Sequence, residues 1–257
     1  MTAEKRIPLH ELREITNGFS VDSRIGQGGY GDVYKGLYKG RDVAVKLLHV
    51  DTIQGIDDQQ YLNEVGNLLR VKHPNIVQLL GYSYETTSEL VEHKGKQGLS
   101  KHIYRVLCFE YLQGESLDKR LPEESFAPDW SIRYMIIKGI CEGLNFLHRV
   151  ISQSHTQVTK QIKGTQAYMP PEFIKDGYIS QMDEVVQFTQ KVLSNWKNRI
   201  KATSEYPLEE SHQVQTCIDT AMRCMELDRN NRPTIAEVLD TLNKTETHIP
   251  KRQEQKD

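Results

Sequence analysis

Several features are missing from this sequence, and each absence excludes a class of protein. No apolar run approaches the roughly 20 residues that a membrane-spanning helix needs, and the N-terminus lacks the apolar segment of a signal peptide. The net charge is only −2, so no excess of positive charge favours nucleic acid or an acidic membrane as a partner. The four cysteines show no C-x-x-C spacing and lie in apolar runs, which indicates buried thiols and a cytoplasmic location.

Acidic residues are missing from one particular stretch. Residues 145–173 contain a single carboxylate, Glu172, and the next acidic residue upstream is Glu142. The 16 residues between Leu147 and Gly164 include no Asp, Glu or Asn. Metal-assisted chemistry on phosphates needs such side chains, so their absence matters if the chain binds a nucleotide.

A glycine-rich motif near the N-terminus points to phosphate binding. Residues 26–31, GQGGYG, follow the pattern G-x-G-x-x-G, which two phosphate-binding folds share. In a dinucleotide-binding fold the glycines open a helix, whereas here a strand, a glycine-containing turn and a second strand follow. This context favours a glycine-rich hairpin whose backbone approaches phosphate oxygens. A glycine-rich turn without a ligand is the structural alternative.

A lysine on the second of these strands strengthens the phosphate hypothesis. Side chains alternate along VAVKLL (residues 43–48), so Ala44 and Lys46 share one face of the strand. A small residue and a cation on one face suit a purine and its phosphates, and Val33 lies where it can cover the purine with Ala44. Glu64 falls on the apolar face of the next helix, where a carboxylate needs a partner, and Lys46 is the obvious one. A solvated Lys46 and a Glu64 that reaches water are the alternatives.

Hydrophobic periodicity divides the chain into a strand-rich first part and a helix-rich second part. Helical spacing marks residues 57–71, whereas the polar stretch 86–104 predicts a long loop between two strands. In the second part, apolar residues repeat every four positions over 130–148, and a further helix is expected over 212–227. The last helix begins at Thr234, where T-I-A-E is a capping box. This order predicts an α+β fold in two lobes.

The residues above resemble those of eukaryotic protein kinases, and in particular plant receptor-like Ser/Thr kinases. The motifs that carry the resemblance are GQGGYGDVYKG, VAVK, HPNIVQLLGY, FEYLQGESLDKRL, GTQAYMPPEF and RNNRPTI, within about residues 8–245. The resemblance implies ATP as the ligand and an ion pair between Glu172 and Arg232. It implies a nucleotide-binding set made of Ile25, Gly26, Gly28, Gly31, Val33, Ala44, Lys46, Glu64, Phe109, Glu110 and Leu112.

The chain departs from the family pattern in two places. The catalytic H-R-D-x-x-x-x-N and D-F-G motifs are absent, and His148-Arg149 matches the end of a helix better than the catalytic loop. After PPEF the family has a long hydrophobic helix that this chain lacks. In the family that helix packs against the stripe Ile132, Ile136, Ile140 and Leu144. The resemblance therefore implies that the catalytic Asp and the ligands for Mg²⁺ are missing.

The sequence thus predicts a two-lobed, protein-kinase-like α+β fold with a β-rich N-lobe and a truncated helical C-lobe. The expected organisation is a juxtamembrane-like segment (1–19), an N-lobe with hinge (20–112), an incomplete C-lobe (113–243) and a disordered tail (244–257). We expect a chain that binds ATP at most and acts as a pseudokinase or interaction module, with other kinases or signalling proteins as partners. Two alternatives stay open: an active Ser/Thr kinase, and a non-functional splice or gene-model product.

Overall fold

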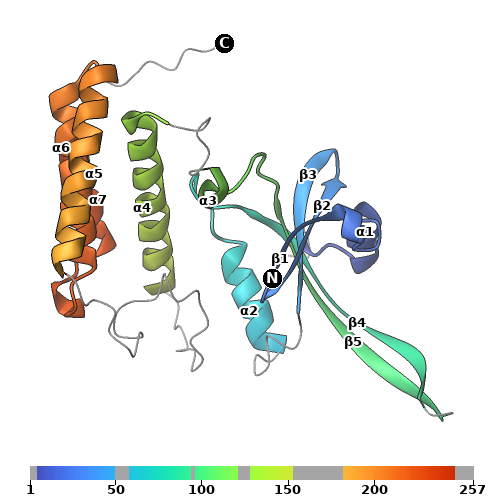
Figure 1. Ribbon diagram of the computed structural model, residues 1–257. Helices are drawn as coiled ribbons and strands as arrows, with labels where there is room; N and C mark the ends of the chain where they lie inside the picture. The colour runs from blue at the N-terminus through green and yellow to red at the C-terminus, as the bar shows by residue number, and fades with distance from the viewer. Residues whose placement is uncertain (1–4, 50–57, 94–95, 121–127, 153–181, 247–257) are drawn as a thin grey trace. The chain divides into compact units, whose positions relative to one another are not determined.

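The computed structural model describes residues 5–49, 58–93, 96–120, 128–152 and 182–246 of the 257-residue chain (Figure 1). The chain divides into two compact units, with the division after Leu117, and each unit is described by itself. Among the described residues, the strands belong to the first unit, and the elements of the second unit are helices. The predicted α+β fold with a strand-rich first lobe and a helical second lobe is confirmed.

A five-stranded antiparallel sheet forms the centre of the first unit, in the order β1-β2-β3-β5-β4. Lys39 and Gly40 turn the chain between β2 and β3 with φ values of 50° and 76°, as a two-residue type I′ hairpin turn requires. The elements of this unit are α1 (Leu9–Ile15), the 3₁₀ turn η2 (Val21–Ser23), β1 (Arg24–Gly28), β2 (Gly31–Tyr38), β3 (Arg41–Leu48), α2 (Asp58–Leu68), β4 (Leu79–His93) and β5 (Lys96–Glu110). The short helix α3 (Leu117–Arg120) follows at the division between the units.

Each face of the sheet is covered by one helix. On one face, Leu9 and Leu12 of α1 pack against a cluster that includes the fully buried Val43 and Val45. On the other face, α2 contributes Tyr61 and Val65 to a second cluster, which also contains Leu79, Tyr82 and Leu107. The alternation predicted for residues 43–48 is confirmed, because the two valines lie in the α1 core and are not part of the α2 cluster.

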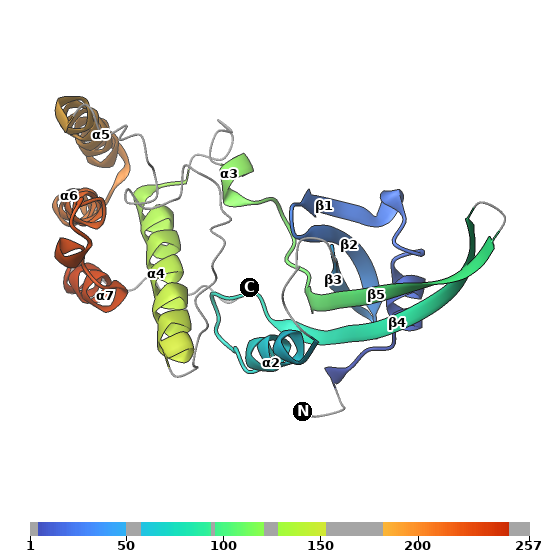
Figure 2. The ribbon, with the colours of Figure 1, turned by 90° about the horizontal axis from the view of Figure 1, so that it is seen from below.

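The region predicted as a long loop is instead a β-ribbon. The β4–β5 pairing continues without a register shift from Gly81–Cys108 to His93–Lys96, so the loop prediction for residues 86–104 is wrong. Strand β3 pairs with β5 only over Val106–Glu110, and beyond that point the ribbon has two strands (Figure 1 and Figure 2). Cross-strand pairs in this ribbon, such as Thr87–His102 and Ser88–Lys101, are polar. The sequence therefore lacks the alternation of apolar and polar residues by which a strand is predicted.

The second unit contains the helices α4 (Trp130–Ser152), α5 (Met182–Thr203), α6 (Pro207–Cys224) and α7 (Ile235–Lys244), with the 3₁₀ turn η6 (Arg229–Asn231) before α7. The helices predicted over 130–148 and 212–227 are confirmed as α4 and α6. The capping box is also confirmed: Thr234 caps α7, and its backbone N–H donates to Glu237 Oε2 at 2.7 Å. Within the described ranges, no helix is both long and apolar enough to cross a bilayer.

One face of α4 packs into the core of the second unit. Trp130 and Tyr134 join Ile200, Val214, Val238 and Leu242 in a single buried cluster, and the Trp130 and Trp196 rings meet edge to face. This cluster uses side chains from α4, α5, α6 and α7. The C-terminal helices therefore close over this face of α4.

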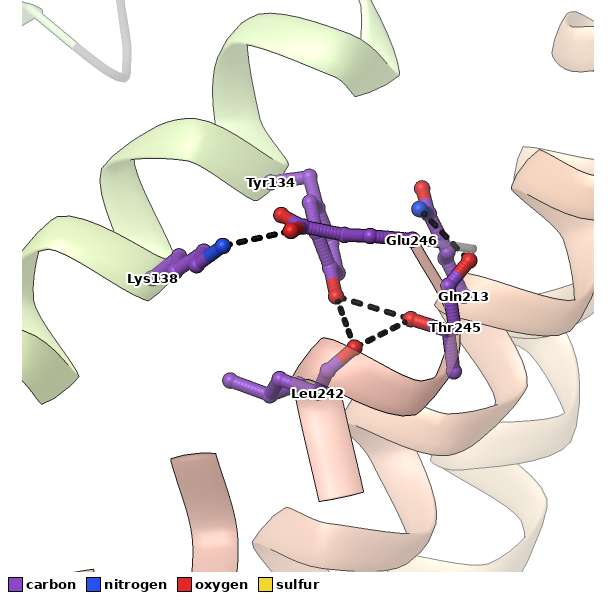
Figure 3. A network of polar contacts seen from close by, with 6 residues as sticks. All are labelled: Tyr134, Lys138, Gln213, Leu242, Thr245 and Glu246. Atoms are coloured by element: carbon purple, nitrogen blue, oxygen red, sulfur yellow. Dashed lines mark hydrogen bonds and ion pairs between the residues drawn. The ribbon is translucent and has the colours of Figure 1, made fainter. Parts of the chain in front are cut away.

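A buried polar network ties α4 to the end of α7 (Figure 3). The Tyr134 hydroxyl donates to the Leu242 carbonyl at 2.7 Å and lies 2.8 Å from the Thr245 hydroxyl. Gln213 of α6 accepts from the Trp130 indole at 3.0 Å and donates to the Thr245 carbonyl at 3.4 Å. Burial raises the pKa of Tyr134 to about 12. The network satisfies polar groups that burial would otherwise destabilise, which fixes how the three helices meet.

The predicted apolar stripe of α4 lies on its other face. Ile140 is 52% exposed, and Ile132, Met135 and Leu144 are exposed as well. The helices α5, α6 and α7 do not cover these side chains, because they pack against Trp130 and Tyr134 instead. The second unit thus has a core and, beside it, an uncovered apolar helix face.

A pair of matched isoleucine substitutions tests this division of α4 and its neighbours. We expect Ile200→Ala to lower the free energy of unfolding by about 2–5 kcal/mol, because Ile200 is only 1% exposed. Ile140→Ala is expected to change it by about 0.5 kcal/mol or less. Both tryptophans of the chain lie in this cluster, so tryptophan fluorescence during urea unfolding reports on the second unit alone. Equal losses from the two substitutions would contradict the packing described.

Candidate functional site

Strand β3 places Lys46 at the centre of the sheet. Lys46 pairs with Val33 of β2 on one side and with Leu107 of β5 on the other, so these three side chains share a face. Ala44 occupies the same face two residues earlier, opposite Phe109 of β5. Lys46, Val33 and Ala44 are all half-buried. The structure therefore brings together the cation, the small residue and the valine that the sequence predicted as neighbours.

The predicted partner of Lys46 stands on the helix that covers this face. Glu64 belongs to α2, and Tyr61 and Val65 of that helix pack against the sheet. The side chain of Glu64 lies outside the part of the chain that the structure describes. The Lys46–Glu64 ion pair stays a prediction.

Gly31 is required by the fold of the glycine loop itself. It begins β2 opposite Leu48 with φ +154°, and a Cβ built there would overlap the backbone oxygen of Leu47. Only glycine has both the conformational freedom and the small size for this approach. Packing inside the first unit therefore explains why residue 31 is glycine, without any role in ligand binding.

The other glycines of the loop are not explained in this way. A Cβ at Gly28 would lie 3.9 Å from the Gly31 oxygen, and one at Gly26 would lie 3.7 Å from Val33 Cβ, both ordinary contacts. A Cβ at Gly29 would meet nothing within 4 Å. No packing inside the unit thus demands glycine at these positions. An open backbone of this kind leaves room for a group that approaches the loop from outside.

Sequence reasoning missed an acidic residue beside the loop. Asp32 Oδ2 lies 3.3 Å from Nε2 of His49, and the His49 backbone N–H donates to the Tyr30 oxygen at 3.2 Å. Asp32 pairs with Leu47 of β3, so it lies on the sheet face opposite Lys46. The contact joins the start of β2 to the residue after β3, and it therefore holds together the open end of the β2–β3 hairpin. A single histidine after a strand gives no sequence signal for such a pair.

The predicted hinge residues have different surroundings. Phe109 packs against the α2 cluster, whereas Leu112 is exposed, as is Ile25 on β1. The Glu110 carboxylate accepts the backbone N–H of Gln78 at 2.7 Å, and the Glu110 N–H donates to the Gln78 oxygen at 3.0 Å. The Glu110 side chain therefore ties the end of β5 to the segment before β4.

The predicted ion pair of the second unit is described on one side only. Arg232 Nε donates to the Glu226 carbonyl at 2.6 Å, and Nη2 donates to the Leu227 carbonyl at 3.3 Å. Glu172 lies outside the described residues, so the Glu172–Arg232 pair stays a prediction. In the described ranges, no group of three or more His, Cys, Asp or Glu side chains is arranged to hold a metal ion.

Comparison with known proteins gives a consistent result. A family model for the protein kinase domain matches residues 19–152. The receptor-like serine/threonine-protein kinase SD1-7 of Arabidopsis thaliana is 27% identical over 320 residues, which cover 95% of this chain and 36% of that protein. Cysteine-rich receptor-like protein kinase 41 of the same plant is 26% identical over 315 residues, covering 96% of this chain and 45% of that protein.

Two further facts follow from these alignments. The chain spans less than half the length of both relatives. Each alignment is also longer than the 257 residues of this chain, so each relative carries internal residues that have no counterpart here. This agrees with the prediction that segments inside the family pattern are missing.

Two glycine substitutions test which glycine of the loop the fold of the first unit requires. We expect Gly31→Ala to weaken the pairing of β2 with β3 by about 1–3 kcal/mol, because the new Cβ meets backbone that cannot move away cheaply. Gly28→Ala is expected to leave it within about 0.5 kcal/mol of the parent. Amide hydrogen exchange of β2 and β3 measures both effects. Similar exchange rates in the two variants would contradict the distinction between these glycines.

Proposed function

The chain belongs to the protein kinase domain family and is a domain of the receptor-like Ser/Thr kinase type, and from this premise we propose that it binds ATP but does not transfer phosphate efficiently. The main support is a contrast within one chain. The strand that carries Lys46, the glycine hairpin and the flanking Val33 and Ala44 are all assembled in the first unit. The carboxylates that the family uses for catalysis are absent from the sequence.

The first unit offers groups that can bind the phosphates and the purine of a nucleotide. The Lys46 ammonium supplies a positive charge for phosphate oxygens, and the open backbone at Gly26, Gly28 and Gly29 permits close approach. Val33 and Ala44 present apolar surface beside Lys46, which suits a purine ring. Charge and shape thus favour a nucleoside triphosphate over a neutral ligand.

The Mg²⁺ site of the family does not fit this chain. In the family, an Asp and an Asn hold the metal ion and a second Asp accepts the proton of the substrate hydroxyl. The stretch between Leu147 and Gly164, where these residues are expected, contains no Asp, Glu or Asn. Loss of a general base alone slows catalysis by roughly 10²- to 10⁴-fold, and loss of the metal adds several kcal/mol to the barrier.

The uncovered face of α4 supports a role in interactions. Ile132, Ile140 and Leu144 are exposed along one side of a helix whose other side is packed. Contiguous apolar patches are uncommon on the surface of monomeric proteins, and where they occur they often mark a protein–protein contact. The interaction role is therefore part of the proposal, alongside nucleotide binding.

Nucleotide binding is tested by a pair of lysine substitutions. We expect the purified chain to bind ATP, and Lys46→Met to weaken binding by tenfold or more, because a charge-assisted contact to phosphate contributes about 1.5–3 kcal/mol. The control is Lys39→Met, which removes a lysine from the turn between β2 and β3, away from the glycine loop that precedes β2. Calorimetric titration measures all three proteins. Equal affinities for the two variants would contradict a phosphate-binding role for Lys46.

Transfer of phosphate is a separate measurement. With radiolabelled ATP and either Mg²⁺ or Mn²⁺, we expect label on the chain or on a generic protein substrate to stay at the level of the Lys46→Met variant. Clear incorporation that the Lys46→Met variant lacks would favour the alternative of an active kinase. A chain that neither binds ATP nor shows cooperative unfolding of its second unit would favour the non-functional product.

A further inference from the structure

The N-terminal segment Lys5–Leu9, here called the N-terminal strap, runs along the edge strand β4. The Ile7 N–H donates to the Tyr82 oxygen at 2.8 Å, and Arg6 forms a parallel bridge with Tyr82. Arg6 Nη2 also donates to the Tyr84 oxygen at 2.9 Å, and Glu85 accepts the Leu9 N–H at 2.9 Å. These bonds satisfy backbone groups that an open sheet edge would expose.

The strap lies so close to β4 that the strand needs a glycine beneath it. A Cβ at Gly81 would come within 2.7 Å of both the Lys5 oxygen and Ile7 Cδ1. Ile7 itself is only 5% exposed and belongs to the same core cluster as Val43 and Val45. The match to the kinase family model begins at residue 19, so the strap lies before the matched region. It is nevertheless part of the core of the first unit.

At its first described residue the strap reaches the C-terminal end of α2. Lys5 Nζ donates to the Leu69 carbonyl at 3.3 Å, directly after the last residue of the helix. The final carbonyls of a helix lack partners within the helix and carry partial negative charge, which a cation stabilises. The last turn of α2 contains no basic residue of its own. The strap therefore brings a cation to this helix end from a distant part of the chain.

The middle of α2 is fixed to the sheet by other contacts. Tyr61 and Val65 are buried against β4 and β5, and the Arg105 guanidinium lies 5.2 Å from the centre of the Tyr61 ring. These contacts hold the middle of the helix, and Leu69, directly after its last residue, also packs against the same cluster. The Lys5 contact acts on its C-terminal end, after Leu68. Strap and sheet together thus determine how α2, the helix that carries Glu64, lies on the sheet.

We propose that the N-terminal strap is a positioning element for α2, with Lys5 as the positioning residue at its C-terminal end. Loss of the Lys5 contact leaves the sheet intact and loosens the last turn of α2. If the proposed function holds, the looser helix also presents Glu64 less well to Lys46, and nucleotide affinity falls. The first consequence does not depend on nucleotide binding, so each can fail by itself.

The test compares Lys5→Met with Lys39→Met in the full chain. Both substitutions replace a lysine by an unbranched apolar residue, but Lys39 lies in the β2–β3 turn with its ammonium beside the Tyr38 ring. Hydrogen exchange of peptides that cover residues 61–71 is followed by mass spectrometry. We expect exchange there to be about two- to tenfold faster in Lys5→Met, the range that corresponds to one lost hydrogen bond, and unchanged in Lys39→Met.

The pattern of exchange separates positioning from general stability. Faster exchange confined to residues 61–71, with β2 and β3 unchanged, supports the proposal. Unchanged exchange in α2, or a uniform increase over the whole first unit, overturns it. Ile7→Ala provides a second variant that releases the buried anchor of the strap. Because Ile7 also packs with Val43 and Val45, we expect this variant to exchange faster both in these peptides and in β3, unlike Lys5→Met. ATP titration of Lys5→Met then shows whether α2 position affects nucleotide binding in a chain that binds ATP.

Discussion

The register of strand β3 is the constraint on which the first unit depends. Val43 and Val45 are fully buried beneath α1, and their alternation with Ala44 and Lys46 directs the lysine to the opposite face. A shift of one residue would exchange the two sets, placing a charge in the core and valines at the candidate site. Burial of each valine contributes about 1.5–3 kcal/mol, so the core itself fixes where Lys46 lies. Pairing with β2 and β5 on both sides then sets its neighbours, Val33 and Leu107.

The core of the second unit is formed by side chains of the helices α4, α5, α6 and α7. Its helices close over Trp130 and Tyr134, and the polar network at Thr245 fixes the junction. The stripe that contains Ile140 is left exposed. One side of α4 is therefore packed into the core of the unit and the other side is exposed. In this respect the two units differ, because both faces of the sheet in the first unit are covered by helices.

Much of the fold is readable from the sequence because it depends on local patterns. Alternation along residues 43–48 gives the two faces of β3, and the Thr234 capping box gives the start of α7. The β4–β5 ribbon is not readable, because its cross-strand pairs are polar and its register depends on contacts far apart in the chain.

Among the candidate residues, the sequence gives the residue type but not its use. Gly31 and Gly28 look alike in the motif, yet only Gly31 is constrained by neighbouring backbone. Glu110 matches a hinge position, but its carboxylate is bonded to the backbone of Gln78, a contact that no local pattern encodes. The N-terminal strap is unreadable for the same reason, since Lys5 and Leu69 are 64 positions apart.

The central claim is that this chain can hold a nucleotide through Lys46 and the glycine hairpin while lacking the carboxylates that recruit a metal ion. Its most direct test is the affinity for ATP measured with excess Mg²⁺ and again with a chelator that removes divalent ions. The account predicts measurable binding in both conditions, with affinities that agree within about threefold, a difference below 1 kcal/mol. Binding that becomes tenfold or more tighter with Mg²⁺ would show that the chain supplies metal ligands after all, and would contradict it.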